Sequence, residues 1–126
     1  MKLAVHFPDF TLPGGYAAAK QLLGSPHNRP TAIFASSDEM AIGSILAARD
    51  LGLHVPHDVS VVGIDDHQLS TFFGLTTVAQ FPRRQGEQAV EALMQLLEPA
   101  TTVPASADVP LPYELIVRSS TARPPQ

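Results

Sequence analysis

Two adjacent carboxylates, Asp65 and Asp66, come directly after the apolar run VSVVGI at positions 59–64. A charge at the end of a buried strand costs free energy unless it is hydrogen-bonded or paired. An ionised carboxylate accepts hydrogen bonds from neighbouring hydroxyls or amines, and these charge-assisted bonds are stronger than neutral ones. The pair could therefore bind a polyhydroxylated ligand. The alternative is that it caps the following turn, where Asp is common.

A second polar group follows the apolar run TAIFA at positions 31–35 and consists of Ser36, Ser37 and Asp38. Ligands of open α/β sheets bind at the carboxyl ends of the strands, so this group should lie on the same rim as Asp65. Two local alternatives remain open, because Ser37 could simply cap a helix and Asp38 could favour its positive N-terminus.

Other chemistry is not indicated. The 126 residues include no cysteine, which excludes disulfides and thiolate metal sites. His54 and His57 flank Pro56 without a third nearby ligand, so solvated histidines are expected. Neither a nucleophile elbow nor a phosphate-binding glycine loop occurs, and we expect no enzyme, metal or cofactor. With eight Lys and Arg and a net charge of −4, the chain alone should not bind DNA.

The elements that position these residues alternate along the chain. Helix 38–51 is predicted from a capping box at Ser36 and Glu39 and a C-terminal Gly52. TAIFA is typical of a strand covered on both faces. The remaining elements are strands at 2–7, 59–64, 75–80 and 113–119 and helices at 14–24 and 82–98. This order predicts an α/β domain with a mostly parallel sheet and flanking helices. No signal peptide or membrane span is recognisable, so we expect a cytoplasmic protein without a membrane partner.

Helix 38–51 is apolar on more than one side. One stripe can pack on the sheet, and the other sides could contact a second copy of the chain. The residues expected at that dimer interface are Ile42, Ile45, Leu46 and Arg49. The alternative is that neighbouring elements of one chain cover the whole helix.

Three motifs in order, SSDEMAIG, VPHDVSVVGIDD and LTTVAQ, resemble the effector-binding region of LacI/GalR-type bacterial transcription regulators. The resemblance runs from Phe10 to Ser120 and implies the C-terminal part of a periplasmic-binding-protein-like fold with two subdomains. It assigns 1–81 and 112–121 to the C-terminal subdomain and helix 82–98 to an N-terminal subdomain that has no counterpart here. Residues 99–111 would form a loop and 122–126 a frayed tail.

The resemblance also implies which residues bind the effector, a sugar or related small molecule. Asp65 would accept from its hydroxyls, Phe10 would stack on its ring, and Ser37 stands where many relatives carry Asn. Gln80 would contact ligand or cap the crossover between subdomains, while a lone Phe such as Phe10 is otherwise usually core. Asp66 is expected to hold the turn. Only half of the pocket would be present, so affinity should be poor.

The interpretation favoured by these motifs is an effector-binding and dimerisation fragment of a LacI-type regulator. Such a fragment would reach DNA only through the missing helix-turn-helix. A fragment of a periplasmic sugar-binding protein and a free-standing interaction domain are the alternatives. The apolar stripe of helix 82–98 would lack its partner, so we expect a homodimer or higher oligomer.

Overall fold

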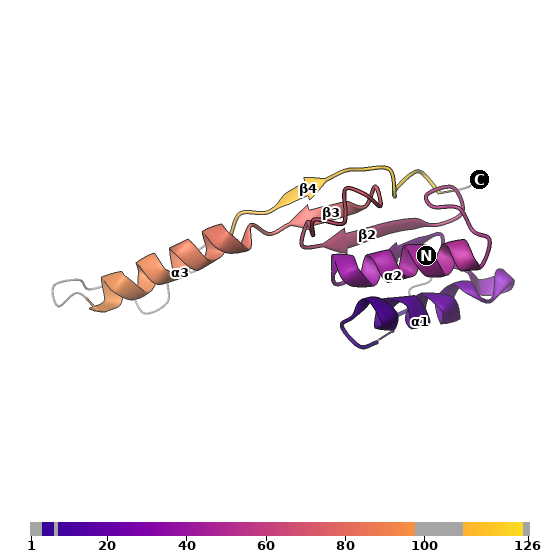
Figure 1. Ribbon diagram of the computed structural model, residues 1–126, viewed down its shortest axis with the longest axis horizontal. Coiled ribbons are helices and arrows are strands. Elements are labelled where there is room, and N and C mark those ends of the chain that lie inside the picture. The colour runs from indigo at the N-terminus through magenta and orange to yellow at the C-terminus, as the bar shows by residue number, and fades with distance from the viewer. Residues whose placement is uncertain (1–3, 7, 98–109, 125–126) are drawn as a thin grey trace.

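The computed structural model describes residues 4–6, 8–97 and 110–124, and within them it forms an α/β fold (Figure 1). Its helices are α1 (Leu12–Leu23), η1 (Pro26–Asn28, a 3-10 turn), α2 (Asp38–Asp50) and α3 (Pro82–Leu97). Its strands are β1 (Ala32–Phe34), β2 (Ser60–Ile64), β3 (Thr76–Ala79) and β4 (Glu114–Ile116). The expected alternation of strands and helices is therefore confirmed from β1 onward, and the strands are shorter than predicted.

The four strands form one sheet in the order β1-β2-β3-β4. The first three strands are parallel, with Phe34 paired to Val62 and Gly63 paired to Thr77. β4 returns antiparallel to β3, where Leu115 is the partner of Val78. A mostly parallel sheet was predicted and is confirmed, and its parallel strands all end at one edge.

Helix α2 lies against the sheet, and α1 packs on the other side of α2 (Figure 1). Two glycines allow the helices to approach closely. A Cβ on Gly43 would come within 2.2 Å of the Leu12 carbonyl oxygen, and one on Gly15 within 2.4 Å of the Met40 carbonyl. The core between these layers is built from small and branched side chains, among them Ile33, Ala41, Ala47, Val61 and Leu75.

Local signals set the ends of α2. Its N-cap is Ser37, whose hydroxyl accepts from the Met40 N–H at 3.3 Å, so the predicted capping box at Ser36 is wrong by one residue. Its C-terminus follows the prediction at Gly52, which has a φ of 72°. The Gly52 and Leu53 N–H groups donate back to the carbonyls of the last turn, each at 2.9 Å, as in a Schellman motif.

Two sequence predictions about strands are wrong. Residues 4–6 of the expected strand 2–7 are irregular, and its residues 2, 3 and 7 lie outside the described residues. β1 is covered on one face only, because Phe34 is 64% exposed whereas Ile33 is buried. Among the described residues, the helix that packs on β1 and β2 is α2, on the Ile33 side, so the Phe34 side of β1 is left uncovered.

Helix α3 projects from this body as a separate arm (Figure 1). It begins at Pro82, as predicted, and none of its residues is buried. Its apolar stripe includes Val90, Leu93 and Leu97, which are 56–69% exposed. Most of the expected loop 99–111 lies outside the described residues. No helix in the part of the chain that is described is both long and apolar enough to cross a bilayer.

Candidate functional site

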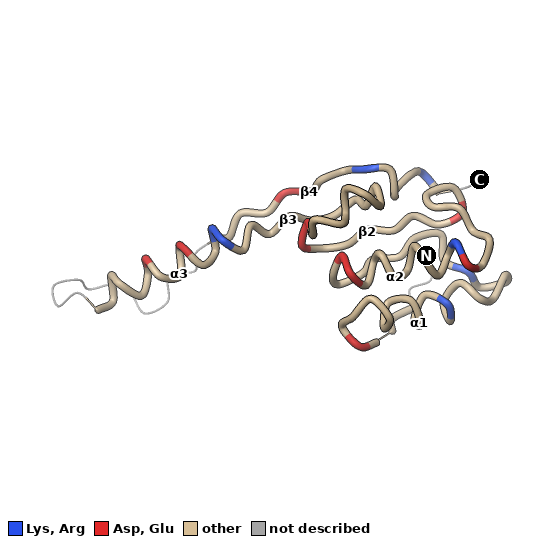
Figure 2. Tube along the Cα trace, viewed as in Figure 1, with Lys and Arg blue, Asp and Glu red and all other residues tan. Residues whose placement is uncertain are grey.

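The candidate site lies where β1, β2 and β3 end. Ser37 follows β1, Asp65 follows β2 and Gln80 follows β3. Acidic residues gather at this end of the sheet and at the adjoining N-terminal ends of the helices (Figure 2). The Gln80 side-chain amide donates to the Asp65 carboxylate at 3.5 Å, so these two predicted site residues meet. The parallel topology therefore produces a shared polar rim.

Asp65 is an exposed carboxylate on an unusual backbone. Its φ is 121°, a value that residues other than glycine rarely adopt, and its N–H donates to the Val78 carbonyl at 3.0 Å. Partial burial raises the pKa of Asp65, and the negative charge of Asp38 raises it further. A hydrogen bond from the Asp38 backbone N–H acts in the opposite direction on that pKa. Asp65 thus lies at the N-terminus of α2 and presents its carboxylate to the rim.

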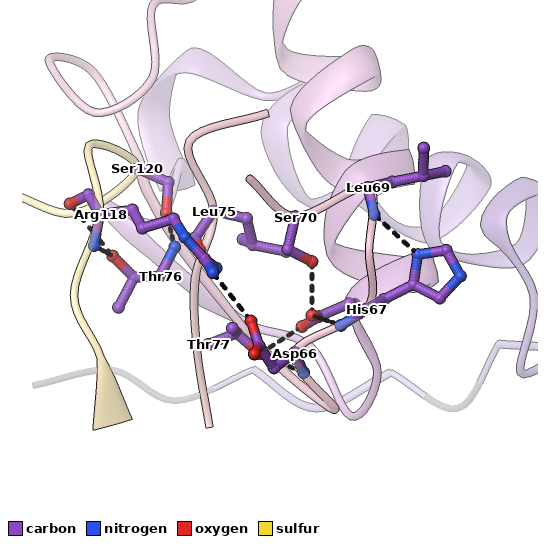
Figure 3. A network of polar contacts seen from close by, with 10 residues as sticks. Asp66, His67, Leu69, Ser70, Leu75, Thr76, Thr77, Arg118 and Ser120 are labelled. Atoms are coloured by element: carbon purple, nitrogen blue, oxygen red, sulfur yellow. Dashed lines mark hydrogen bonds and ion pairs between the residues drawn. The ribbon is translucent and has the colours of Figure 1, made fainter. Parts of the chain in front are cut away.

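Asp66 has a different environment, which Figure 3 shows in detail. Its carboxylate accepts from the Arg118 guanidinium at 2.8 Å, and its N–H donates to the Thr77 hydroxyl at 3.3 Å. The same guanidinium donates to the Leu75 carbonyl at 2.8 Å. Asp66 is therefore tied into the turn, and its partner Arg118 is a residue that the sequence alone did not indicate.

The other carboxylate at this edge, Asp38, is fully buried. It accepts hydrogen bonds from the Thr77 hydroxyl at 2.6 Å, the Ser70 hydroxyl at 2.5 Å and the His67 N–H at 2.9 Å. The sequence predicted only an interaction with the helix N-terminus. The missed signal was the polar pair Thr76 and Thr77 in an otherwise apolar strand, since buried hydroxyls require partners.

Phe10 and Ser37 occupy contrasting positions. Phe10 is 65% exposed immediately before α1, so it is not a core residue of this chain. Ser37 is 3% exposed, and its hydroxyl serves as the α2 cap, the local alternative that the sequence had left open. Of the predicted ligand residues, the structure thus brings Asp65 and Gln80 into contact and leaves Phe10 exposed at the surface.

The helix side expected at a dimer interface is only partly accessible. Ile42 is 1% exposed and belongs to the core, so it offers no surface to a second chain. Ile45 and Leu46 are half-buried beside that core, and Arg49 is exposed. The accessible part of this side is therefore formed by Ile45, Leu46 and Arg49.

A hollow of about 510 Å³ lies along α3 between Gln85, Ala89, Ala92 and Leu111. None of the predicted ligand residues lines it. Among the described residues, no three His, Asp or Glu side chains are grouped as ligands for a metal ion. The candidate site is therefore the polar rim around Asp65, where the predicted residues Asp65 and Gln80 meet.

Comparison with known proteins gives a consistent result. A family described as "Periplasmic binding protein-like domain" matches residues 2–121. The transcriptional regulator MalR of Streptomyces coelicolor is 48% identical over 118 residues, which are 92% of this chain and 33% of MalR. The transcriptional repressor PurR of Escherichia coli is 40% identical over 103 residues, 80% of this chain and 30% of PurR. The chain spans about one third of these relatives.

Solved structures agree with the sequence relatives. A Lac repressor bound to ONPG has a TM-score of 0.80 and 33% identity over 90% of this chain and 34% of its own length. A LacI family transcriptional regulator from Lactobacillus casei with bound sucrose has a TM-score of 0.72 and 33% identity. That match covers 88% of this chain and 41% of the regulator.

Proposed function

Because this chain belongs to the LacI family of transcriptional regulators, as part of their periplasmic-binding-protein-like region, we propose that it forms one wall of an effector site. The observation that carries this proposal is the contact between Gln80 and Asp65 at the carboxyl edge of the sheet. The two residues are far apart along the chain, and parallel pairing of β2 and β3 brings them together. Ligands of open α/β sheets bind at this edge.

The proposed effector is a sugar or a related polyhydroxylated molecule. Asp65 supplies an exposed carboxylate that can accept from two neighbouring hydroxyls. Gln80 adds an amide that can both donate and accept, and the exposed ring of Phe10 suits the C–H face of a sugar. The bound sucrose of the Lactobacillus casei regulator, which is a relative of similar fold, supports this ligand class.

In this proposal the chain supplies half of the cleft. Helix α3, whose apolar stripe is uncovered, packs in the opposing subdomain, which closes the effector from water. DNA is bound by a separate helix-turn-helix domain, and the chain has no catalytic function. The relatives named as transcriptional regulators favour this role, in the cytoplasm, over that of a periplasmic sugar-binding protein. Self-association through Ile45, Leu46 and Arg49 of α2 completes the proposal.

An NMR titration of the 126-residue chain with a panel of sugars and nucleobases that includes sucrose tests the effector site. We expect saturable changes in the amide chemical shifts of Asp65, Gln80 and Phe10. The dissociation constant should be in the millimolar range, because one wall alone gives weak binding. Asp65→Asn should abolish the chemical shift changes. The control is Asp50→Asn. The Asp50 carboxylate accepts a hydrogen bond from the Tyr16 hydroxyl at 2.6 Å, and its substitution should leave the chemical shift changes intact. Absence of shifts at these residues with every panel member would contradict the proposal.

A further inference from the structure

Asp38 is a buried carboxylate whose three hydrogen-bond donors are all neutral groups. The Thr77 hydroxyl donates to Oδ1, and the Ser70 hydroxyl and the His67 N–H donate to Oδ2. Its exposed fraction is 0%. Burying a charge is costly unless hydrogen bonds replace its water, and these three hydrogen bonds offset that cost for Asp38. The positions of its donors in the chain indicate which backbone segment Asp38 holds.

All three donors come after the Asp65–Asp66 step in the chain. His67 and Ser70 lie in the segment that follows it, and Thr77 lies on the neighbouring strand β3. The Thr77 hydroxyl also accepts from the Asp66 N–H at 3.3 Å, so one hydroxyl links the Asp38 carboxylate to the backbone next to Asp65. Asp38 therefore anchors residues 66 and 67 through two independent contacts.

The backbone held in this way is strained. Asp65 has a φ of 121° and Asp66 a φ of 52°, and neither is a glycine. Such conformations persist only where surrounding contacts impose them, and they concentrate at ligand sites. The strand also makes room for Asp38, since a Cβ on Gly63 would come within 2.2 Å of its Oδ1. A side chain at that position would displace the carboxylate from its donors.

We propose that Asp38 is the positioning residue of the effector site: it fixes the strained backbone at Asp65 and Asp66 and so directs the Asp65 carboxylate toward the ligand. This inference rests on the proposed effector site but concerns a residue that itself has no exposed surface. Asp38 acts through Asp65, because its own oxygens are occupied by Thr77, Ser70 and His67. The sugar therefore need never touch Asp38.

Asp38→Asn tests the inference because it preserves shape but replaces one acceptor oxygen with an NH2 donor. That donor would face either the Thr77 hydroxyl or the pair formed by Ser70 and His67. The matched control is Ser44→Ala, which removes a buried hydrogen bond of 3.0 Å to the Met40 carbonyl on the same helix. The control leaves every contact of residues 65–70 intact.

The first readout needs no ligand. Amide hydrogen exchange followed by NMR should show loss of protection, about tenfold or more, at Asp66 and His67 in Asp38→Asn and not in Ser44→Ala. Unchanged protection at those two amides would overturn the inference even if sugar binding is established. Conversely, loss of protection without any sugar binding to the parent chain would count against the proposed function alone.

The second readout is affinity for the sugar that produces shifts in the parent chain, with sucrose as the first probe. We expect at least about tenfold weaker binding in Asp38→Asn and parent-like binding in Ser44→Ala. Equal affinity in Asp38→Asn and the parent would contradict the positioning role.

A pair of variants at Thr77 covers the case in which Asp38→Asn does not fold. Thr77→Val keeps the shape but deletes the hydroxyl that links Asp38 to the Asp66 N–H, and Thr77→Ser retains that hydroxyl. Amide protection at Asp66 should fall in the Val variant and be restored in the Ser variant. Two variants with the same protection would overturn the relay.

Discussion

The Arg118 guanidinium and the Asp66 carboxylate form an ion pair of 2.8 Å that joins the segment after β4 to the turn after β2. The two residues are 52 positions apart in the chain. Both side chains are partly buried, with exposed fractions of 20% and 34%. The pair thus connects the last described segment of the chain to the backbone that carries Asp65.

We expect Arg118→Gln to destabilise the chain more than Asp66→Asn, because Arg118 also donates to the Leu75 carbonyl at 2.8 Å. In a double-mutant cycle by urea unfolding, the coupling energy of the two side chains should be about 1 kcal/mol. It should decrease at high salt. A coupling energy indistinguishable from zero would show that the ion pair does not hold the turn.

Gly63→Ala should destabilise the chain by about 1–3 kcal/mol, because the new methyl group would overlap the Asp38 carboxylate. Gly86→Ala on α3 is the matched control. Its Cβ would meet nothing within 4 Å, so the free energy of unfolding should stay unchanged or rise by up to about 1 kcal/mol. Chemical denaturation of the two variants checks this prediction, and equal effects would contradict it.

The raised pKa of Asp65 predicts how the stability of the fold depends on pH. Burial and the charges of Asp38 and Glu39 raise this pKa, whereas His67 and the Asp38 N–H lower it. Because the folded pKa lies above the unfolded one, Asp65 favours the folded state below the unfolded pKa. That contribution is lost as the pH rises through the folded pKa. Asp65→Asn should therefore have a higher Tm than the parent at neutral pH.

This difference in Tm should shrink as the pH falls through the raised pKa, because the parent carboxyl then also becomes neutral. Sugar binding should weaken over the same pH range, since the ligand is bound by the ionised form. Thermal unfolding of both chains across the acidic range measures the first effect. A Tm of Asp65→Asn below that of the parent at neutral pH would contradict this prediction. It would show that the hydrogen bonds to the Asp65 carboxylate outweigh its burial and its repulsion by Asp38 and Glu39.

The exposed stripe of α3 predicts self-association of the chain at micromolar concentration, measured as a mass above that of the monomer by light scattering. Leu93→Glu should lower the measured mass, because it puts a charge in the middle of the apolar stripe. Gln95→Glu adds the same charge on the opposite side of the helix and should leave the mass unchanged. A monomeric parent chain would refute this prediction.

Much of the fold could be predicted because it is encoded locally. The apolar runs around β1 and β2, the periodic pattern of α2 and the glycine after it depend on residues within a few positions of each other. The shared strand edge then follows from parallel topology, which explains why Asp65 and the group Ser36, Ser37 and Asp38 could be predicted to lie on one rim. The contact between Gln80 and Asp65 was not predicted from the topology. The motifs also sufficed to identify the family.

Contacts between residues distant in the chain could only be decided by the tertiary structure. Asp38 looked like a helix N-terminal carboxylate, yet its partners His67 and Thr77 are 29 and 39 positions away. The exposure of Phe34 was equally hidden, since an apolar run is the same whether one face of its strand is covered or both. The sequence by itself determined most of the helices and strands, the family and the strand edge that carries Asp65. Only packing decided that Asp38 is buried, that Asp66 is paired with Arg118 and that Asp65 is exposed, because these states depend on neighbours that no local pattern specifies.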